Sequence, residues 1–212
     1  MPDIPHVDVK AQYERLIPQL QERIAEVLDS GVFILGPNVK AFETEVAQHL
    51  GVPRAVGVAN GTDALVLALD AMRIGPDDEV ICPAFTFYAT AESIARRGAT
   101  PVFADIDPVT LNLDPEDVAA KITDRTRAIM PVHLFGRVLP LQGLAELGIP
   151  IIEDAAQAYG AEGVAQVGAL STFSFFPTKN LFALGDGGLV AATDEELADR
   201  VTVLRFHGSR DK

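Results

Sequence analysis

The sequence has 212 residues, 48% of them hydrophobic, and this length favours one large globular domain with a substantial core over two domains. The 30 acidic and 17 basic residues give a formal charge of −13, which repels polyanions and argues against nucleic-acid binding. A lone cysteine, Cys82, excludes an internal disulfide framework and a multi-thiolate zinc site, so a reducing compartment fits.

The sequence contains neither a secretory signal pattern at its start nor an apolar segment long enough to cross a membrane. The start, "MPDIPHVDVK", lacks the basic flank and the apolar stretch of a secretory signal. No later segment approaches ~18 uninterrupted apolar residues, the length that a transmembrane helix needs. We therefore expect a cytoplasmic protein that does not contact a membrane.

The first 35 residues are predicted to form an N-terminal helix and arm. Residues 11–31, "AQYERLIPQLQERIAEVLDSG", have a helical pattern, and Pro18 lies early enough to mark the first turn or a kink. We expect this helix to pack on the following domain or on a partner.

From about residue 55 onward, short β-rich runs alternate with segments of helical period. This alternation is typical of βαβ units and predicts an α/β fold with a mostly parallel sheet, covered by helices on both faces. In one predicted helix Asp63 lies in the first turn and Arg73 in the last. The expected strands are residues 54–59, 79–84, 100–106, 126–132, 149–154 and 187–193, and the clearest helices are 62–75, 86–98 and 194–208.

The turn in "VGVANGTDALVLAL" is a candidate phosphate site. The N–H groups at the start of a helix lack intrahelical partners and attract anions. Gly61 allows close approach of a ligand, and Thr62 offers an N–H and a hydroxyl. The plain alternative is a turn with an ordinary helix cap.

An acidic pair, Glu153 and Asp154, ends the buried run "IPIIED". Consecutive strand residues point to opposite faces, so one carboxylate at most readily faces a pocket. Such a group could cap the next helix, bind a metal, or pair with a protonated ring nitrogen. A metal is disfavoured because the histidines are scattered without ligand spacing, at His6, His49, His133 and His207.

Lys179 lies between an apolar run and a glycine-rich turn in "FSFFPTKNLFALGDGG". Lysine is rarely buried unless it is paired, so either its ammonium points into water from a surface loop, or it is a desolvated amine that forms a Schiff base. Ser174 adds a hydroxyl near the same strand end. A phosphate cradle, a strand-end carboxylate and a desolvated lysine together match the needs of pyridoxal phosphate.

With these residues in place, the sequence resembles the DegT/StrS family of sugar aminotransferases. The resemblance is carried by "GVFILGP", "ANGTDAL", "DEVICPAFTFYATAE", "PVFADIDP", "GIPIIEDAAQA" and "FSFFPTKNLFALGDGG", the last two being specific. It implies a fold-type I pyridoxal-phosphate enzyme with a three-layer α/β/α large domain over residues 36–212. It also implies that the chain stops before the family's smaller C-terminal domain.

The resemblance assigns cofactor roles residue by residue. Lys179 matches the lysine that bonds the cofactor and later carries a proton between substrate and cofactor. Asp154 matches the carboxylate that keeps the pyridine nitrogen protonated, Gln157 the residue beside the phenolic oxygen, and Phe87 the aromatic stacked on the ring. The matches to the phosphate contacts are Gly61, Thr62 and Ser174.

The resemblance also implies substrates and a partner. Gly31, Phe33 and Thr178 match segments that contact the sugar nucleotide. The expected reaction moves an amino group, from glutamate, to a keto group of a nucleotide-linked sugar. The complete protein is expected to be a homodimer that shares its active sites across the interface.

Other functions remain open at the level of sequence. A sugar dehydratase of the same fold would replace the lysine with histidine, so Lys179 favours transamination. Asp105 and Asp107 resemble the paired acids of magnesium-dependent phosphotransferases, although a turn after a strand also explains them. A non-catalytic, cofactor-binding fragment is the third alternative. His133 is expected to be a satisfied polar residue, and the glycines at 185–188 are expected to serve backbone geometry.

Overall fold

The computed structural model describes residues 4 and 6–210. Residues 1–3 and 5 of the predicted arm, and residues 211–212 of the predicted domain, lie outside the described residues. The chain forms two compact units, residues 1–42 and 43–212, and each is described by itself. The predicted division between residues 35 and 36 stays a prediction.

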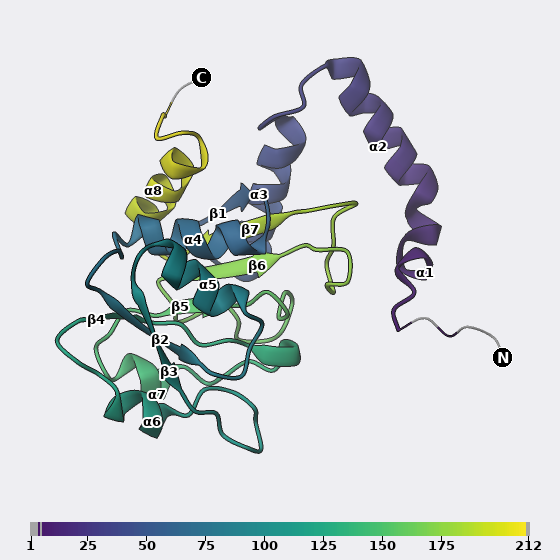
Figure 1. Ribbon diagram of the computed structural model, residues 1–212. Coiled ribbons are helices and arrows are strands. Elements are labelled where there is room, and N and C mark those ends of the chain that lie inside the picture. The colour runs from purple at the N-terminus through teal and green to yellow at the C-terminus, as the bar shows by residue number, and fades with distance from the viewer. Residues whose placement is uncertain (1–3, 5, 211–212) are drawn as a thin grey trace. The chain divides into compact units, whose positions relative to one another are not determined.

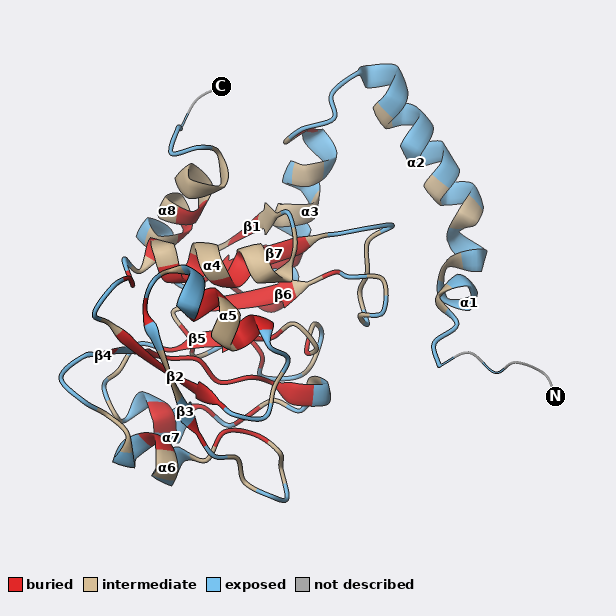
Figure 2. Ribbon diagram, in the orientation of Figure 1, coloured by how far each residue is buried: buried red, intermediate tan, exposed pale blue. Residues whose placement is uncertain are grey.

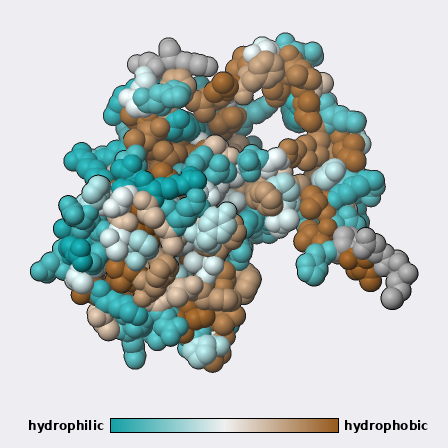
Figure 3. Space-filling view, in the orientation of Figure 1, coloured by the Kyte–Doolittle hydropathy of each residue, from teal (hydrophilic) through white to brown (hydrophobic). Residues whose placement is uncertain are grey.

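The first unit is mainly helical, and its helical run is interrupted just before Pro18, where a first turn or a kink was predicted. It contains α1 (Val9–Tyr13), the 3₁₀ turn η1 (Glu14–Leu16) and α2 (Ile17–Ser30). Pro18 lies in the first turn of α2, as predicted, where its missing N–H costs no hydrogen bond. Gly31 ends α2 in the left-handed conformation, with φ of +65°. No residue of α2 is buried (Figure 2), and hydrophobic and hydrophilic residues lie side by side along it (Figure 3).

The second unit is built on a mostly parallel sheet, as the alternating pattern predicted. Its strands are β1 (Arg54–Val58), β2 (Glu79–Pro83), β3 (Thr100–Ala104), β4 (Thr126–Ile129), β5 (Ile152–Asp154), β6 (Leu170–Ser174) and β7 (Gly188–Ala192). They pair in the orders β3-β2-β4 and β5-β6-β7-β1. Parallel bridges from Ile129 to Ile151 and from Val132 to Asp154 join the two sets. Only β7 runs antiparallel to its neighbours.

Helices cover both faces of this sheet, which gives the predicted α/β/α layers (Figure 1). The core on one face includes residues of α4, α5 and α8, and the core on the other includes residues of α6 and α7. The helix α3 (Pro37–Leu50) contains the division between the two units. The helices that follow are α4 (Gly61–Ala71), α5 (Ala89–Arg96), α6 (Pro115–Ala120), α7 (Gln142–Ala145) and α8 (Glu195–Arg205), with the 3₁₀ turn η2 (Leu134–Gly136).

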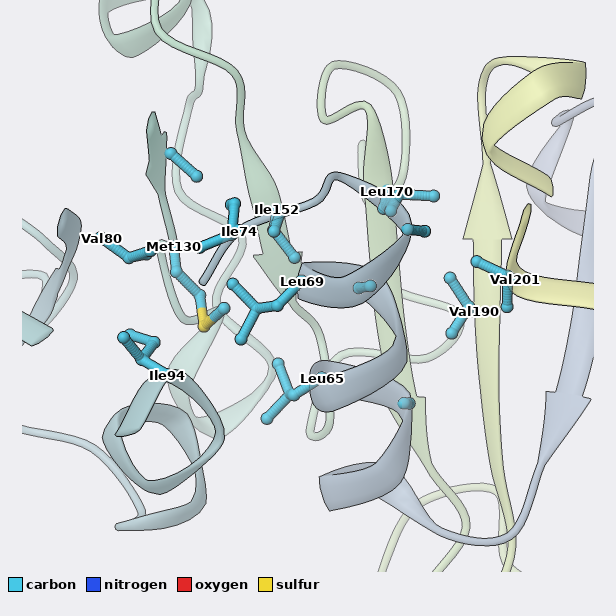
Figure 4. Close-up of a cluster of buried hydrophobic side chains, with 14 of the residues drawn as sticks. Leu65, Leu69, Ile74, Val80, Ile94, Met130, Ile152, Leu170, Val190 and Val201 are labelled. Atoms are coloured by element: carbon cyan, nitrogen blue, oxygen red, sulfur yellow. The ribbon is translucent and has the colours of Figure 1, made fainter. Parts of the chain in front are cut away.

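Strand alternation divides the buried residues between the two layers. Val80 and Cys82 of β2 pack in the cluster around α4, shown in Figure 4, whereas Ile81 between them packs with α6 and α7. All three are fully buried, which confirms Cys82 as a core thiol. Burying one such aliphatic side chain stabilises the fold by about 1.5–3 kcal/mol.

Two predicted helix ends are corrected. The helix α4 ends at Ala71, so Arg73 lies beyond its last turn, in the left-handed conformation at φ of +59°. Its N–H donates to Asp70 O, and the N–H of Ile74 donates to Leu69 O, which is the Schellman arrangement. Ile74 is buried in the same core as Leu69, and this contact outweighs the preference for glycine.

The helix α5 begins at Ala89 rather than at residue 86, so Phe87 precedes it in a loop and is 60% exposed. No side chain caps its first turn. The Thr86 hydroxyl contacts the Thr90 hydroxyl at 3.0 Å.

Candidate active site

The residues predicted to bind the cofactor meet where β1, β5 and β6 end. The register brings Val58, Ser174 and Gly188 side by side at one edge of the sheet, and Asp154 ends the next strand. A cavity of about 630 Å³ lies here, a volume typical of small-molecule sites. The predicted residues that line it are Gly61, Thr62, Phe87, Asp154, Gln157, Ser174, Thr178 and Lys179.

Two glycines allow the backbone to close around one end of this cavity. A Cβ atom on Gly61 would lie 2.6 Å from the Ser174 Cβ, and one on Gly188 would lie 2.3 Å from the Asn60 carbonyl oxygen. Neither distance is tolerated in proteins, so both positions require glycine. Gly185 adopts φ of +148°. The glycine turn therefore serves backbone geometry and close packing, as predicted.

The start of α4 presents unpaired donors beside a hydroxyl. The Asn60 side chain caps the helix by accepting from the Asp63 N–H at 2.8 Å, and the Ala64 N–H reaches the Asn60 carbonyl. Among the described residues, the N–H groups of Gly61 and Thr62 have no acceptor. Ser174 is held against them by the close approach of Gly61. This arrangement suits an anion with several acceptor oxygens, such as a phosphate.

Asp154 lines the cavity and is buried, with 5% of its surface exposed. The Thr90 hydroxyl donates to its Oδ2 at 2.8 Å, and the Ala156 N–H donates to its Oδ1 at 3.2 Å. Burial raises the pKa of the Asp154 carboxyl, and these two hydrogen bonds, together with the charge of Lys179, offset only part of the effect. A cationic N–H placed against this carboxylate would supply the missing stabilisation.

Glu153 points to the opposite face, as the strand alternation predicted. Its carboxylate accepts from the N–H groups of Ala165 and Gly168 and contacts His133 Nε2 at 2.9 Å. The Leu139 N–H donates to His133 Nδ1, so Nε2 carries the proton and donates to Glu153. Both side chains are fully buried. His133 is thus a satisfied polar residue, as expected.

The three donors also control the charge of Glu153. Burial raises the pKa of the Glu153 carboxyl, but the hydrogen bonds from His133, Ala165 and Gly168 outweigh burial and lower the pKa below its ordinary value.

Lys179 is half-buried in the turn after β6. Burial lowers the pKa of its ammonium group below the ordinary value of 10.5, and the nearby Asp154 offsets part of this effect. Among the described residues, its amine has no carboxylate within ion-pair distance. A desolvated amine of this kind is more readily deprotonated, which is the condition for nucleophilic attack.

Two further residues complete the wall of the cavity. The Gln157 Oε1 accepts from the Phe135 N–H at 2.6 Å, so its amide nitrogen is the group left to donate to a ligand. Phe87 is largely exposed and lines the cavity. This exposure excludes a core role for Phe87, whose ring contacts that of Tyr88 with 4.3 Å between the ring centres.

The comparisons with known proteins agree with this geometry. The sequence pattern of the DegT/DnrJ/EryC1/StrS aminotransferase family matches residues 15–212. The chain belongs to this family. Membership confirms the resemblance read from the motifs.

Several relatives of known name extend the comparison, and the chain spans about 59% of their length. A UDP-N-acetyl-3-dehydro-alpha-D-glucosamine 3-aminotransferase of Acidithiobacillus ferrooxidans is 48% identical over 97% of this chain and 58% of its own. A protein of Geobacillus stearothermophilus named pleiotropic regulatory protein is 48% identical over 99% of this chain and 59% of its own.

Solved structures of the family share the fold. The Streptomyces venezuelae protein DesV, in complex with a ketimine intermediate, has a TM-score of 0.95 and 45% identity, covering 100% of this chain and 59% of that chain. NtdA of Bacillus subtilis with bound cofactor PMP has a TM-score of 0.92 and 30% identity. The match covers 100% of this chain and 51% of that chain. These likenesses confirm the predicted fold class.

Not every residue assigned from the DegT/StrS resemblance lies in the described cavity. Gly31 and Phe33 belong to the first compact unit, so their role as substrate contacts stays a prediction. Thr178 lines the cavity next to Lys179.

Several side chains at the site carried no prediction from the sequence. The most informative is Thr90, which contacts Thr86 and donates to Asp154; Asp154 lies 64 residues away, so no local pattern identifies this bond. The other cavity residues not assigned a role beforehand include Asn60, Tyr88, Glu92, Arg96 and Asp186.

Asp105 and Asp107, the acids of the phosphotransferase alternative, accept hydrogen bonds from the turn that follows β3. Asp107 accepts from the N–H groups of Val109 and Thr110, and Asp105 accepts from the Ile106 N–H, so both acids stabilise a turn. Within residues 4 and 6–210, no group of three or more candidate ligand side chains could hold a metal ion. Over the same residues, none of the helices combines the length and apolar character needed to cross a membrane.

Proposed function

We propose that this chain is the cofactor-binding domain of a pyridoxal-phosphate-dependent aminotransferase, which transfers an amino group from glutamate to a keto group of a nucleotide-linked sugar. The observation that carries the proposal is the placement of Asp154 and Lys179 in one cavity with the unpaired donors of α4. A buried carboxyl without a cationic hydrogen-bond partner, an amine with a lowered pKa and an anion site are the three features that this cofactor needs.

Each end of the cavity would hold a different part of the cofactor. The N–H groups of Gly61 and Thr62 and the Ser174 hydroxyl would bind the phosphate. Asp154 would hold a proton on the ring nitrogen, and the Gln157 amide nitrogen would donate to the phenolic oxygen. Phe87 would pack on the ring face and exclude water from it.

Lys179 would act as both the nucleophile and the acid–base group. Its Nζ would bind the aldehyde carbon of the cofactor and, when released by the substrate, would move a proton between the substrate carbon and the cofactor. The bound cofactor supplies the electron sink for the charge that this proton transfer leaves on carbon. The lowered pKa of Lys179 favours both roles because the amine must be unprotonated to accept a proton.

The acceptor class is proposed from the relatives. Among the proteins that match are named transaminases of UDP-linked and dTDP-linked 3-amino sugars, including one from Streptomyces venezuelae that is 45% identical. We infer the same class of acceptor for the whole protein, with glutamate as donor and 2-oxoglutarate as co-product. We also infer a cytoplasmic homodimer.

Reconstitution with pyridoxal phosphate tests the cofactor assignment. The purified chain should develop the visible absorption of a lysine-bound cofactor, and after borohydride reduction the peptide carrying Lys179 should retain the cofactor's mass. Lys179→Ala should lose both signals. Lys121→Ala is the matched control, because Lys121 pairs with Asp117 beside α6, outside the cavity.

The name of the Geobacillus relative and the partial coverage of longer relatives keep a second function in view, a cofactor-binding protein without catalysis. A stoichiometric reaction with glutamate separates the two. Loss of the visible band with formation of one equivalent of 2-oxoglutarate supports the aminotransferase. A stable band that glutamate does not change supports the non-catalytic protein.

A further inference from the structure

A chain of two hydroxyl groups connects the cavity wall to Asp154. The hydroxyl oxygens of Thr86 and Thr90 lie 3.0 Å apart, and Thr90 Oγ1 lies 2.8 Å from Asp154 Oδ2. Thr90 is fully buried on α5, and Thr86 lines the cavity in the loop before that helix. Neither residue belongs to the set assigned above to cofactor or substrate.

The direction of this chain follows from donor and acceptor counts. An ionised carboxylate can only accept hydrogen bonds, so the Thr90 hydroxyl must donate its single proton to Asp154. The contact between the two threonines then requires Thr86 to donate to Thr90. Hydrogen bonds in series polarise one another, so the Thr86 proton strengthens the bond from Thr90 to Asp154.

Few other groups stabilise the charge on Asp154. Its remaining hydrogen bond, from the Ala156 N–H, is longer at 3.2 Å. The titratable groups near it include Lys179 after β6, which favours its charged form, and His133 after β4, whose ring is engaged by Leu139 and Glu153. The third is Cys82 on β2, whose own pKa is raised by burial and by Asp154 to about 12, so it contributes no compensating charge. Thr90 therefore provides the shortest hydrogen bond to the carboxylate from the described residues.

We propose that Thr90, supported by Thr86, is a positioning residue that holds Asp154 ionised and in one orientation toward the cavity. This inference rests on the proposed function, because the proton that Asp154 is meant to hold belongs to the cofactor's ring nitrogen. A carboxylate offers about four acceptor positions, and the described residues fill two of them. The others are free for a cationic N–H.

In this arrangement the Thr90 hydroxyl keeps Asp154 ionised, and the carboxylate of Asp154 pairs with the ring nitrogen. Without the Thr90 hydroxyl, burial would favour the neutral acid, which cannot keep a pyridine nitrogen protonated. The substitution Thr90→Val keeps the shape and the β-branch but removes the proton. It should raise the pKa of Asp154 and weaken the electron sink, even though the cofactor's phosphate and lysine contacts are intact.

The first experiment uses the protein without cofactor. Carbon NMR of labelled aspartate side chains, titrated over pH, should show the Asp154 carboxyl protonating at higher pH in Thr90→Val than in the wild type. Thr90→Ser, which restores a hydroxyl, should return the midpoint toward the wild-type value. Ser93→Ala is the matched control on the same helix, because the buried Ser93 hydroxyl donates to the Thr90 carbonyl and not to Asp154.

The second experiment measures the reconstituted protein. The rate of the half-reaction with glutamate should fall at least about tenfold in Thr90→Val, the loss expected from one hydrogen bond to a charged group. The affinity for pyridoxal phosphate should change much less, since the phosphate contacts remain. Thr90→Ser should recover most of the rate, and Ser93→Ala should resemble the wild type.

Two results would overturn the proposal: an Asp154 titration that is the same in Thr90→Val and the wild type, or a rate that Thr90→Ser does not recover. If Thr90→Val fails to fold, Thr86→Val replaces it and should give a smaller rise in the same direction; no rise overturns the proposal. A wild-type chain that binds no pyridoxal phosphate, while Asp154 still responds to Thr90→Val, contradicts the proposed function and supports the hydroxyl chain.

Discussion

The contact between Gly61 and Ser174 gives a prediction whose size follows from the structure. In Gly61→Ala the new methyl carbon would lie 2.6 Å from the Ser174 Cβ and 3.2 Å from its Cα, whereas ordinary contact begins near 3.4 Å. Rotating the serine side chain cannot relieve this clash, because both atoms are fixed by the backbone of β6. The start of α4 must therefore move away from the strand.

Overpacking of this kind costs about 1–3 kcal/mol in proteins. For a chain of this length, each kcal/mol lowers the unfolding temperature by about 2–4 °C. Urea and thermal unfolding of the cofactor-free protein, followed by circular dichroism, should both report the loss. Phosphate binding by α4 should weaken as well, because its donors move relative to Ser174.

A matched control and a compensating change sharpen this test. Gly143 lies in α7, where a Cβ would meet nothing within 4 Å, so Gly143→Ala should be neutral or stabilise by up to about 1 kcal/mol. Ser174→Gly removes the clashing Cβ, so the double variant should be more stable than the sum of the single effects predicts, by at least about 0.5 kcal/mol. Equal stability of Gly61→Ala and the wild type would refute the reasoning.

Three further predictions concern buried titratable groups. Glu153→Ala should cost about 3–5 kcal/mol of unfolding free energy, because it leaves three buried donors unpaired. The pKa of Glu153 is lowered in the fold, so its contribution is present above its ordinary pKa of 4.5 and is lost as pH falls through the lower folded value. Acid unfolding should show this loss in the wild type and not in Glu153→Gln. The lowered pKa of Lys179 means that its charge destabilises the cofactor-free fold at neutral pH, and this effect disappears as pH rises toward 10.5. Lys179→Met should therefore be more stable than the wild type at pH 7, and the difference in unfolding free energy should close in alkali. The Cys82 thiol, with a pKa raised to about 12 by burial, should resist alkylation in the native protein and react on unfolding; rapid native labelling would contradict its burial.

The sheet was predictable from sequence because its strands carry local signals. Strand β2 is an apolar run bounded by acidic residues and a proline, and all five of its residues are buried. Similar runs placed β1, β3, β4, β5 and β7 within a few residues of their observed ends, whereas no bounds were predicted for β6. Parallel order then required the chemical residues to gather at the carboxyl ends, and they do.

Helix ends were less predictable because tertiary packing overrides local preference. The helix before Gly75 was expected to end at that glycine. It ends earlier, since burying Ile74 against Leu69 requires Arg73 to take the left-handed conformation. Likewise α5 begins at Ala89 and not at residue 86, and Thr86 lies in the loop before it, where its hydroxyl contacts Thr90. Both outcomes depend on partners that periodicity alone does not identify.

The neighbours Glu153 and Asp154 show how far the argument from sequence could reach. Strand geometry predicts that they face opposite ways, but it does not say which one faces a ligand. The number of hydrogen-bond donors distinguishes the two carboxylates. Glu153 accepts three hydrogen bonds and its pKa is lowered, whereas Asp154 accepts two and its pKa is raised by burial. A buried carboxylate whose charge is balanced by hydrogen-bond donors stabilises the fold, whereas a buried carboxylate with fewer donors can still accept a cationic ligand. The two adjacent acids therefore differ in their partners. Glu153 accepts from His133, Ala165 and Gly168 on one face of the strand, whereas Asp154 accepts from Thr90 of α5 and from the nearby Ala156.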